Sequence, residues 1–580
     1  YDLKENPHHL YFLNSFFSNI FCIVLSFGFI LKTSVFIYKL RYHGIFNITI
    51  LFIMLFNKMN LKKNIEIFYI LFLFFFSVLI NQYYGNQGIN PIDSFFSFNS
   101  GYDILNGHYP FKDYWTITGP FIAFVQAIFF KILGVSWFSY VFHASIFNFI
   151  ITILTFYTFY KFKLNIHFCF IYSLFVSILA YPSSGTPYVD HHASYLSVIS
   201  IFFFILALKT KSKFYWFVLP IILGISFLSK QAPTGHFFLI ITFLSIFYFI
   251  YNFNFQKILF GLTGTFIFLS IFILILFINK ISIISFYEQY ILFPLSLGES
   301  RLNFLFPLEF SRIILRFKLI HLSYLILLLI SFKEILKNFK YVKSNEFLII
   351  VSLIATSYAL IVHQLMTING LYIFFIIPIL SGFSHIYYEK YLIHKKYILY
   401  LLIFITTVST GYYANKYIHK RDFMDLRLAE MSKAIDAQIL SKKLNGLKWI
   451  TVLNISNPQQ EILNLQKAID IIQKDKRKKI IVTDYQFISV ISSIYDYSPS
   501  QVWFGYHVNP SQNSKYFKLY KNFFIEKINE NEIKIIYVVK PLWGGDRIIE
   551  KPLSKNCFKK VRITEILDKY TLLTCDDLKK

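Results

Sequence analysis

Three aspartates follow the first strongly apolar run that is well flanked by lysines, in positions where carboxylate chemistry could occur. They are Asp93, Asp103 and Asp113, within a polar stretch at residues 81–120 that reads NQYYGNQGINPIDSFFSFNSGYDILNGHYPFKDYWTITGP. A carboxylate where a span leaves the membrane is costly to place near lipid and usually has a function. Such a group can accept a proton from a hydroxyl. The stretch therefore predicts an enzyme that works at a membrane face.

Asp93 is our first candidate for the base, because it follows the turn-forming pair Asn90-Pro91 soon after the apolar run. The alternative role for Asp93 is to cap a helix. Asp113 is interpreted either as a group that binds an acceptor or a metal or as a solvated loop charge. Asp103 is expected to be a surface residue on a helix, and no chemistry is assigned to it.

A second polar group, Asp190-His191-His192, stands in the segment SSGTPYVDHH at the start of a later apolar run. We expect this segment to be exposed outside the membrane. Asp190 and His191 are assigned to substrate binding, through sugar hydroxyls or phosphate. A divalent metal ion is left open, with Asp190 and His192 as its candidate ligands, because adjacent histidines cannot easily face one metal together. Helix capping by Asp190 and an interfacial position for the histidines are the alternative.

Positively charged side chains that could bind a phosphate occur at two other places. Lys230 and Gln231 end an apolar run at the external face, where an isolated lysine runs against the positive-inside rule. Binding of a lipid phosphate would explain that lysine, and snorkelling to the interface is the alternative. Arg301, in a long polar loop, is a candidate phosphate contact or a solvated charge. His363 and Gln364 interrupt an apolar region, where they would line a cavity or join helices by hydrogen bonds.

Composition decides the class of protein that must position these residues. The chain has 580 residues, of which 56% are hydrophobic and only 15% charged, with a mean hydropathy of +0.53. Soluble domains average about 25% charged residues, so most of this chain must lie in lipid. The net charge of +26 comes largely from lysines in short loops between apolar runs, as the positive-inside rule expects. We therefore expect no binding of nucleic acid.

The lysine positions orient the spans. They predict about eleven crossings, with the polar stretch 81–120 and the C-terminus on the external side. The predicted spans are residues 65–80, 137–160, 167–181, 195–208, 215–229, 237–251, 258–278, 319–332, 347–362, 371–388 and 397–413. Residues 121–133 are short and contain Lys131, which favours an interfacial or re-entrant helix.

Residues 416–580 have the charged composition and patterning of a soluble domain. Buried strands are expected at 480–483 and 533–539, and an amphipathic helix at 462–474. The fold class is thus a polytopic α-helical membrane protein with a C-terminal extracytoplasmic α/β domain. Two cysteines of this domain, Cys557 and Cys575, either form a disulfide or stay free.

Residues 1–58 do not fit the alternation of spans, since making both of their apolar runs cross would leave a lysine cluster on the wrong side. Met59 directly precedes a good cytoplasmic flank. We therefore expect residues 1–58 to be an N-terminal extension, from a mis-set start or a fragment of a neighbouring gene, and residues 59–415 to be the transmembrane domain.

The order of features resembles one enzyme superfamily over roughly residues 60–415. An early external aspartate, the motif LNGHYPFKDYW followed by Gly119-Pro120, and an acidic residue at the head of a later span are similar to GT-C glycosyltransferases. The likeness is strongest to the bacterial branch with protein O-mannosyltransferases and lipid A aminoarabinose transferases. That branch carries an Asp-Glu pair in the first external loop, whereas here Asp93 precedes Ser94. The resemblance implies an inverting transfer of a sugar from a polyprenyl-phosphate donor.

The leading hypothesis is therefore a glycosyltransferase of the bacterial inner membrane, with its C-terminal domain in the periplasm. Such a reaction needs a base for the acceptor proton and cations for the departing lipid phosphate. The acceptor would be a lipid, a glycan or a protein, and no cofactor beyond the open metal is expected. A polysaccharide polymerase or ligase is one alternative, and a flippase for lipid-linked sugars is another. A flippase would favour internal repeats or broken-helix pairs, which the sequence does not contain.

Overall fold

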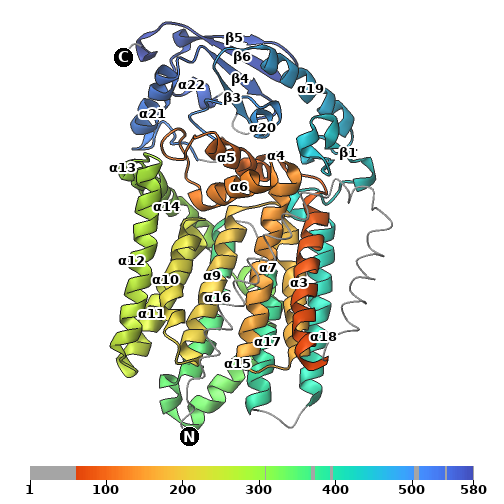
Figure 1. The fold of residues 1–580 in the computed structure, drawn as a ribbon, viewed down its shortest axis with the longest axis vertical. Coiled ribbons are helices and arrows are strands. Elements are labelled where there is room, and N and C mark those ends of the chain that lie inside the picture. The colour runs from red at the N-terminus through yellow and green to blue at the C-terminus, as the bar shows by residue number, and fades with distance from the viewer. Residues whose placement is uncertain are drawn as a thin grey trace.

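A bundle of long helices carries a C-terminal domain at one end, with a layer of short helices between them (Figure 1). This computed structural model describes residues 61–578 apart from 307, 368–372, 392–395, 502–507, 543–544 and 546, so the predicted N-terminal extension lies outside the described residues. The bundle helices are α3 (Leu61–Gly85), α7 (Trp137–Lys161), α8 (Ile166–Leu179), α9 (Val189–Lys209), α10 (Phe214–Phe227), α11 (Gln231–Tyr251), α12 (Phe255–Ile278), α15 (Lys318–Lys337), α16 (Asn345–Thr367), α17 (Ile376–Tyr391) and α18 (Lys396–Tyr413).

The polytopic helical class predicted from composition is confirmed. Within the described residues, nine helices are long and apolar enough to cross a membrane. α10 and α17, with 14 and 16 residues, are shorter but complete the bundle in Figure 1. Every apolar run predicted as a span coincides with one of these eleven helices.

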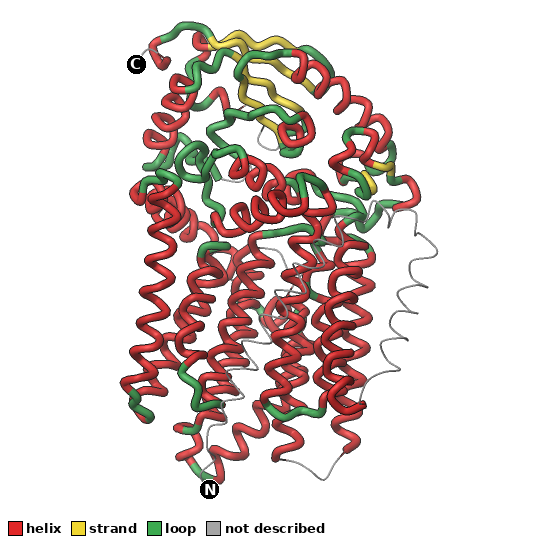
Figure 2. The backbone as a smooth tube through the Cα atoms, in the orientation of Figure 1, coloured by secondary structure: helices red, strands yellow, loops and turns green. Residues whose placement is uncertain are grey.

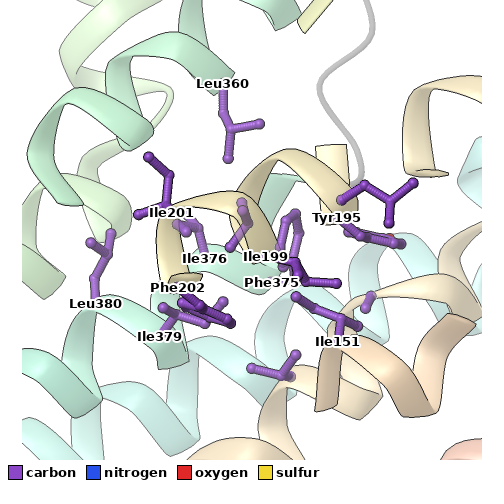
Figure 3. Packing of buried hydrophobic residues seen from close by; sticks show 14 of the residues in the cluster. Ile151, Tyr195, Ile199, Ile201, Phe202, Leu360, Phe375, Ile376, Ile379 and Leu380 are labelled. Carbon is purple, nitrogen blue, oxygen red and sulfur yellow. The ribbon is translucent and has the colours of Figure 1, made fainter. Parts of the chain in front are cut away.

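α9 is the central helix, with the whole of its apolar stretch buried inside the protein. It packs against α7, α10, α11 and α16. Figure 3 shows Tyr195, Ile199 and Phe202 of α9 among side chains from α7, α16 and α17. A helix that is apolar all round in this way is expected in a core, surrounded by other helices. The first turn of α9 is therefore surrounded by protein, so a polar side chain in that turn does not face lipid.

Three short helices form the layer between the bundle and the C-terminal domain (Figure 1). They are α4 (Pro91–Ser94), α5 (Phe96–Leu105) and α6 (Pro120–Leu133). α6 lies across the end of the bundle instead of along it, as its short length and its lysine predicted. Two further short helices, α13 (Ile283–Phe286) and α14 (Phe293–Leu305), follow α12 at the same end of the bundle (Figure 1).

The C-terminal domain (residues 416–578) contains a small four-stranded sheet, drawn in yellow in Figure 2. The strand order is β3-β4-β6-β5, in which β3 and β4 are parallel and the other pairs antiparallel. Its elements are β1 (Ile435–Asp436), β2 (Lys448–Trp449), α19 (Pro458–Lys474), β3 (Lys479–Thr483), α20 (Ile488–Ser492), α21 (Phe517–Glu530), β4 (Ile535–Val539), α22 (Arg547–Glu550), β5 (Phe558–Arg562) and β6 (Leu567–Leu572). β3, β4 and α19 coincide with the predicted strands and helix, and Cys557 and Cys575 form a disulfide.

The loop that carries the aspartates is attached to the C-terminal domain at both of its ends. Near its start, the Ile89 amide donates to the Ile450 carbonyl at 3.1 Å. Near its end, the Trp115 amide donates to the Pro499 carbonyl at 2.8 Å, and the buried Trp115 ring packs against Tyr520. The C-terminal domain is thus bonded directly to the segment that holds the candidate base.

Candidate active site

Asp93 lies in α4, a single helical turn that follows Asn90 and has Pro91 as its first residue. Proline suits this position because the first amide of a helix needs no intrahelical partner. The Asn90 amide donates to Ser94 Oγ at 3.1 Å, and Asn90 Nδ2 donates to Asp425 Oδ2 at 3.1 Å. The N-cap position is therefore Asn90, so the alternative in which Asp93 caps the helix is wrong.

Asp93 faces the residues that open α9 and α11. The Tyr188 hydroxyl, immediately before α9, donates to Asp93 Oδ1 at a long 3.5 Å. The Asp93 carboxylate also lies within Coulombic range of Lys230, the residue that precedes α11. The Arg301 guanidinium of α14 is also within Coulombic range of Lys230, with the opposite effect because both are cations. Three segments distant in sequence therefore bring charge to one place.

Asp190 is at the centre of this charge. Lys230 Nζ donates to Asp190 Oδ1 at 2.6 Å, and His363 Nε2 on α16 bonds the same oxygen at 2.8 Å. The Asp190 and His363 side chains are 7% and 1% exposed, whereas the Lys230 side chain keeps 19%. Lys230 thus has the most exposed side chain of the three.

We call Asp93, Asp190, Lys230, Arg301 and His363 the ion cluster. Its carboxylates and cations are arranged at the end of the bundle that carries the C-terminal domain. Asp190 Oδ1 is engaged by both Lys230 and His363. Lys230 and Arg301 bring positive charge to the same place as the carboxylates.

The prediction that residues 183–192 are exposed is wrong. The whole segment is buried, and both histidines are fully enclosed. His191 Nε2 bonds Ser183 Oγ at 2.9 Å, while His192 Nε2 lies 3.1 Å from His143 Nε2 and His192 Nδ1 bonds Tyr181. The covering elements are the short-helix layer and the C-terminal domain, which the sequence does not place over this segment.

The metal site considered for Asp190 and His192 does not fit their contacts. Asp190 is bonded to Lys230 and His363, whereas His192 belongs to the separate histidine pair with His143. Among the residues that the structure describes, no group of three or more His, Cys, Asp or Glu side chains could hold a metal ion.

Two other predicted site residues have different neighbours. Gln231 Nε2 donates to the Ile117 carbonyl at 3.2 Å and to the Tyr290 carbonyl at 2.7 Å, so its side chain ties the aspartate loop to the segment after α13. Asp113 Oδ2 accepts a hydrogen bond from the Tyr109 amide at 2.8 Å, which closes a turn. The Asp113 carboxylate lies within Coulombic range of Asp103, which is not part of the ion cluster.

Asp103 is buried, so its expected surface position is wrong. Gln501 Nε2 and Asn99 Nδ2 donate to Asp103 Oδ2 at 2.7 and 3.0 Å, which joins α5 to the C-terminal domain. Burial raises the pKa of the Asp103 carboxyl well above its usual value. The helix on which Asp103 was expected is present as α5, and only the docking of the C-terminal domain on that helix was missed.

Arg421 has a structural role that the sequence analysis did not find. Its guanidinium is fully buried and donates to four carbonyls, those of Gln87, Pro182, Ser183 and Ser184, at 2.8 to 3.2 Å. It therefore links the loop before Asp93 to the segment before Asp190. In the sequence, Arg421 follows a lysine shortly after an apolar run. A cation in that position is usually interpreted as a side chain that snorkels to the membrane interface.

No protein-family model and no curated protein matches the chain. Three solved structures are similar to the chain at 9 to 12% sequence identity. An oligosaccharyltransferase from Archaeoglobus fulgidus, in complex with Zn and sulfate, gives a TM-score of 0.38 at 12% identity, over 80% of this chain and 68% of that chain. ArnT from Cupriavidus metallidurans, bound to undecaprenyl phosphate, gives 0.45 at 9%, over 88% and 98%. The archaeal oligosaccharyltransferase AglB from Archaeoglobus fulgidus, with an inhibitory peptide and a dolichol-phosphate, gives 0.39 at 12%, over 82% and 70%. Similarity at this level does not by itself establish a function.

Proposed function

We propose that this protein is a membrane glycosyltransferase that moves a sugar from a polyprenyl-phosphate donor to a hydroxyl of a lipid, glycan or protein. One observation carries the proposal: Lys230 Nζ donates to Asp190 Oδ1, and both the Asp93 carboxylate and the Arg301 guanidinium lie within Coulombic range of Lys230. A base beside cations is the arrangement that this transfer needs. The resemblance of the sequence to GT-C glycosyltransferases supports the same reading.

In the proposed step, the acceptor oxygen bonds to the anomeric carbon of the sugar. The bond from that carbon to the phosphate oxygen breaks, and its electron pair leaves with the lipid phosphate. Asp93 takes the proton of the acceptor hydroxyl, and Lys230 and Arg301 stabilise the charge that develops on the phosphate. Attack from the side opposite to the phosphate gives inversion, as the resemblance implies.

Asp190 and His363 act on Lys230 in this scheme and need no contact with the substrate. Because Asp190 Oδ1 accepts from Lys230 Nζ, the ammonium is fixed in one position before the donor arrives. His363 holds the same oxygen from the opposite helix. His191 and His192, which lie in the protein interior, would then support the segment before Asp190 and would not bind a sugar.

The transfer would take place at the membrane face that carries the C-terminal domain. The lysine pattern places this face outside the cytoplasm, which corresponds to the periplasm for a bacterial inner membrane. The attachment of the aspartate loop to the C-terminal domain at both ends supports a role for that domain beside an acceptor that binds at Asp93. A polysaccharide polymerase or ligase and a lipid-linked-sugar flippase are the competing functions.

The test is sugar transfer by the purified protein from a panel of polyprenyl-phosphate sugars. Asp93→Asn is compared with the parent, and Asp470→Asn is the matched control because Asp470 is an exposed aspartate on α19. Circular dichroism and detergent gel filtration check that the three proteins are folded alike. Each reaction is run with EDTA and with added Mg²⁺ or Mn²⁺, so that a metal requirement is measured directly.

We expect transfer by the parent and the control and a loss of at least about 100-fold in Asp93→Asn, in line with the effect of removing a catalytic base. Full activity in Asp93→Asn would keep the enzyme class and move the base to Asp113 or Asp190. No transfer from any donor, with sugar-lipid movement across vesicles instead, would favour the flippase. Elongation of a glycan chain would favour the polymerase.

A further inference from the structure

A groove runs along the outer surface of the bundle between α15 and α18, away from the ion cluster. Both helices pack on α17, and little of one touches the other, which leaves a space between them. The groove has a volume of about 730 Å³ and lies at the ends of the two helices nearest the C-terminal domain. Its walls are apolar for most of their length, with Leu319, Leu322, Phe404 and Val408 among them.

Cations gather at the mouth of this groove. Arg316, Lys318 and Lys416 line it, and Lys416 also borders an adjoining hollow that contains Lys420. In the described parts of the chain, none of these four side chains forms an ion pair with a carboxylate. A cluster of positive charge on the face that the loop lysines assign to the exterior runs against the positive-inside rule, and therefore calls for an anionic partner.

We propose that the groove is a binding site for an anionic phospholipid of the adjacent leaflet. The phosphate of its headgroup would lie between Arg316, Lys318 and Lys416, and an acyl chain would follow the apolar walls. Arginine and lysine side chains near a membrane surface attract anionic lipids in this way. The Ser409 and Tyr412 side chains, which also line the groove, place hydroxyls near the same mouth.

The lining favours a lipid that is held and not transformed. The described residues that line the groove include no Asp, Glu or His. The groove therefore offers no carboxylate or imidazole that could take the proton of an acceptor hydroxyl. The carboxylates and histidine of the ion cluster come from α4, α9 and α16, which do not line it. A phospholipid, the most abundant phosphate-bearing lipid of a bilayer, is therefore a better occupant than a sugar donor. The proposal is independent of the function proposed above.

The experiment is native mass spectrometry of the full-length protein released from nanodiscs that contain equimolar phosphatidylglycerol, phosphatidylcholine and undecaprenyl phosphate. Two variants change the groove: a triple variant with Arg316→Gln, Lys318→Gln and Lys416→Gln, and Val408→Trp, which fills the groove without changing its charge. The matched control carries Lys333→Gln, Lys340→Gln and Lys396→Gln, three exposed lysines at or just beyond the opposite ends of the same helices. Val408 is 53% exposed, so its replacement does not disturb the core.

We expect the parent and the control to retain phosphatidylglycerol at least about tenfold over phosphatidylcholine. Both groove variants should lose that enrichment, while their thermal unfolding midpoints match the parent. Equal retention of the two phospholipids, or enrichment that survives in both variants, would overturn the proposal. Retention of undecaprenyl phosphate in place of phosphatidylglycerol would also overturn it, and would assign the groove to a substrate-type lipid.

Discussion

Lys230 Nζ donates to Asp190 Oδ1 at 2.6 Å, although Lys230 immediately precedes α11 and stands 40 positions after Asp190 in α9. The bond forms inside the protein, where the Asp190 side chain is only 7% exposed. A buried ion pair contributes little net stability by itself, because both charges must be desolvated. Its members nevertheless depend on each other, since either one alone would be an uncompensated charge.

The first prediction concerns this dependence. Asp190→Ala leaves the Lys230 ammonium and His363 without their shared acceptor, so we expect a loss of about 3 kcal/mol in the free energy of unfolding. The double variant Asp190→Asn with Lys230→Met removes both charges and should recover most of that loss. Thermal unfolding of the parent, Asp190→Asn, Lys230→Met and the double variant in one detergent measures the coupling between the two positions. Additive effects of the two changes would contradict the pairing.

The second prediction concerns Arg421. Its guanidinium donates to four carbonyls in two loops, and a lysine with a single nitrogen cannot reproduce this planar fork. We expect Arg421→Lys to lower the free energy of unfolding by roughly 3 kcal/mol and to speed proteolysis of the loop before Asp93. Arg427→Lys is the control, because Arg427 is half exposed and its hydrogen bonds within the described residues go to Asp422, so this change should leave the free energy of unfolding close to that of the parent.

The elements of the fold could be predicted because each depends on local residue patterns. The eleven apolar runs, the strands β3 and β4 and the helix α19 can all be predicted from periodicity and from lysine positions. Asp93, Asp190 and Lys230 could each be proposed as functional, since charge beside an apolar run is costly. Their grouping could not be predicted, because it depends on the packing of helices that are far apart in sequence. The burial of Asp103 was missed for the same reason, as Gln501 lies 398 positions away.

The third prediction uses the Cys557–Cys575 disulfide to test the orientation of the chain. Disulfides persist outside the cytoplasm and are rare inside it. In a Cys22→Ser, Cys169→Ala background, we expect maleimide-polyethylene glycol to label neither remaining thiol in intact cells until a reductant is added. Labelling without reductant that occurs only after the cells are permeabilised would place the C-terminal domain in the cytoplasm and contradict the predicted orientation. Replacing both cysteines by serine should also destabilise the domain by about 3 kcal/mol.

The fourth prediction concerns Asp496, which lies between α20 and the segment that docks on Trp115. Burial raises the pKa of Asp496 to about 7, although its Oδ1 accepts hydrogen bonds from the Ile481 and Ser498 amides at 2.9 and 3.0 Å. The unfolded chain has the ordinary aspartate pKa of about 3.9. The folded protein therefore holds a proton that the unfolded chain releases. The stability from this proton is complete below about pH 4 and is lost as the pH rises through about 7.

Asp496→Asn isolates that contribution, because the asparagine Oδ1 keeps both acceptor positions and has no proton to release. Relative to this variant, the parent should lose up to about 1.4 kcal/mol of stability for each pH unit between about pH 4 and about pH 7. Burial lowers the pKa of nearby His108 to about 4, which gives the opposite slope below pH 6.5, but His108 is present in both proteins and cancels in the difference. Melting temperatures are measured by tryptophan fluorescence across this pH range. If the melting temperatures of parent and variant change with pH in parallel, Asp496 is already ionised in the folded protein.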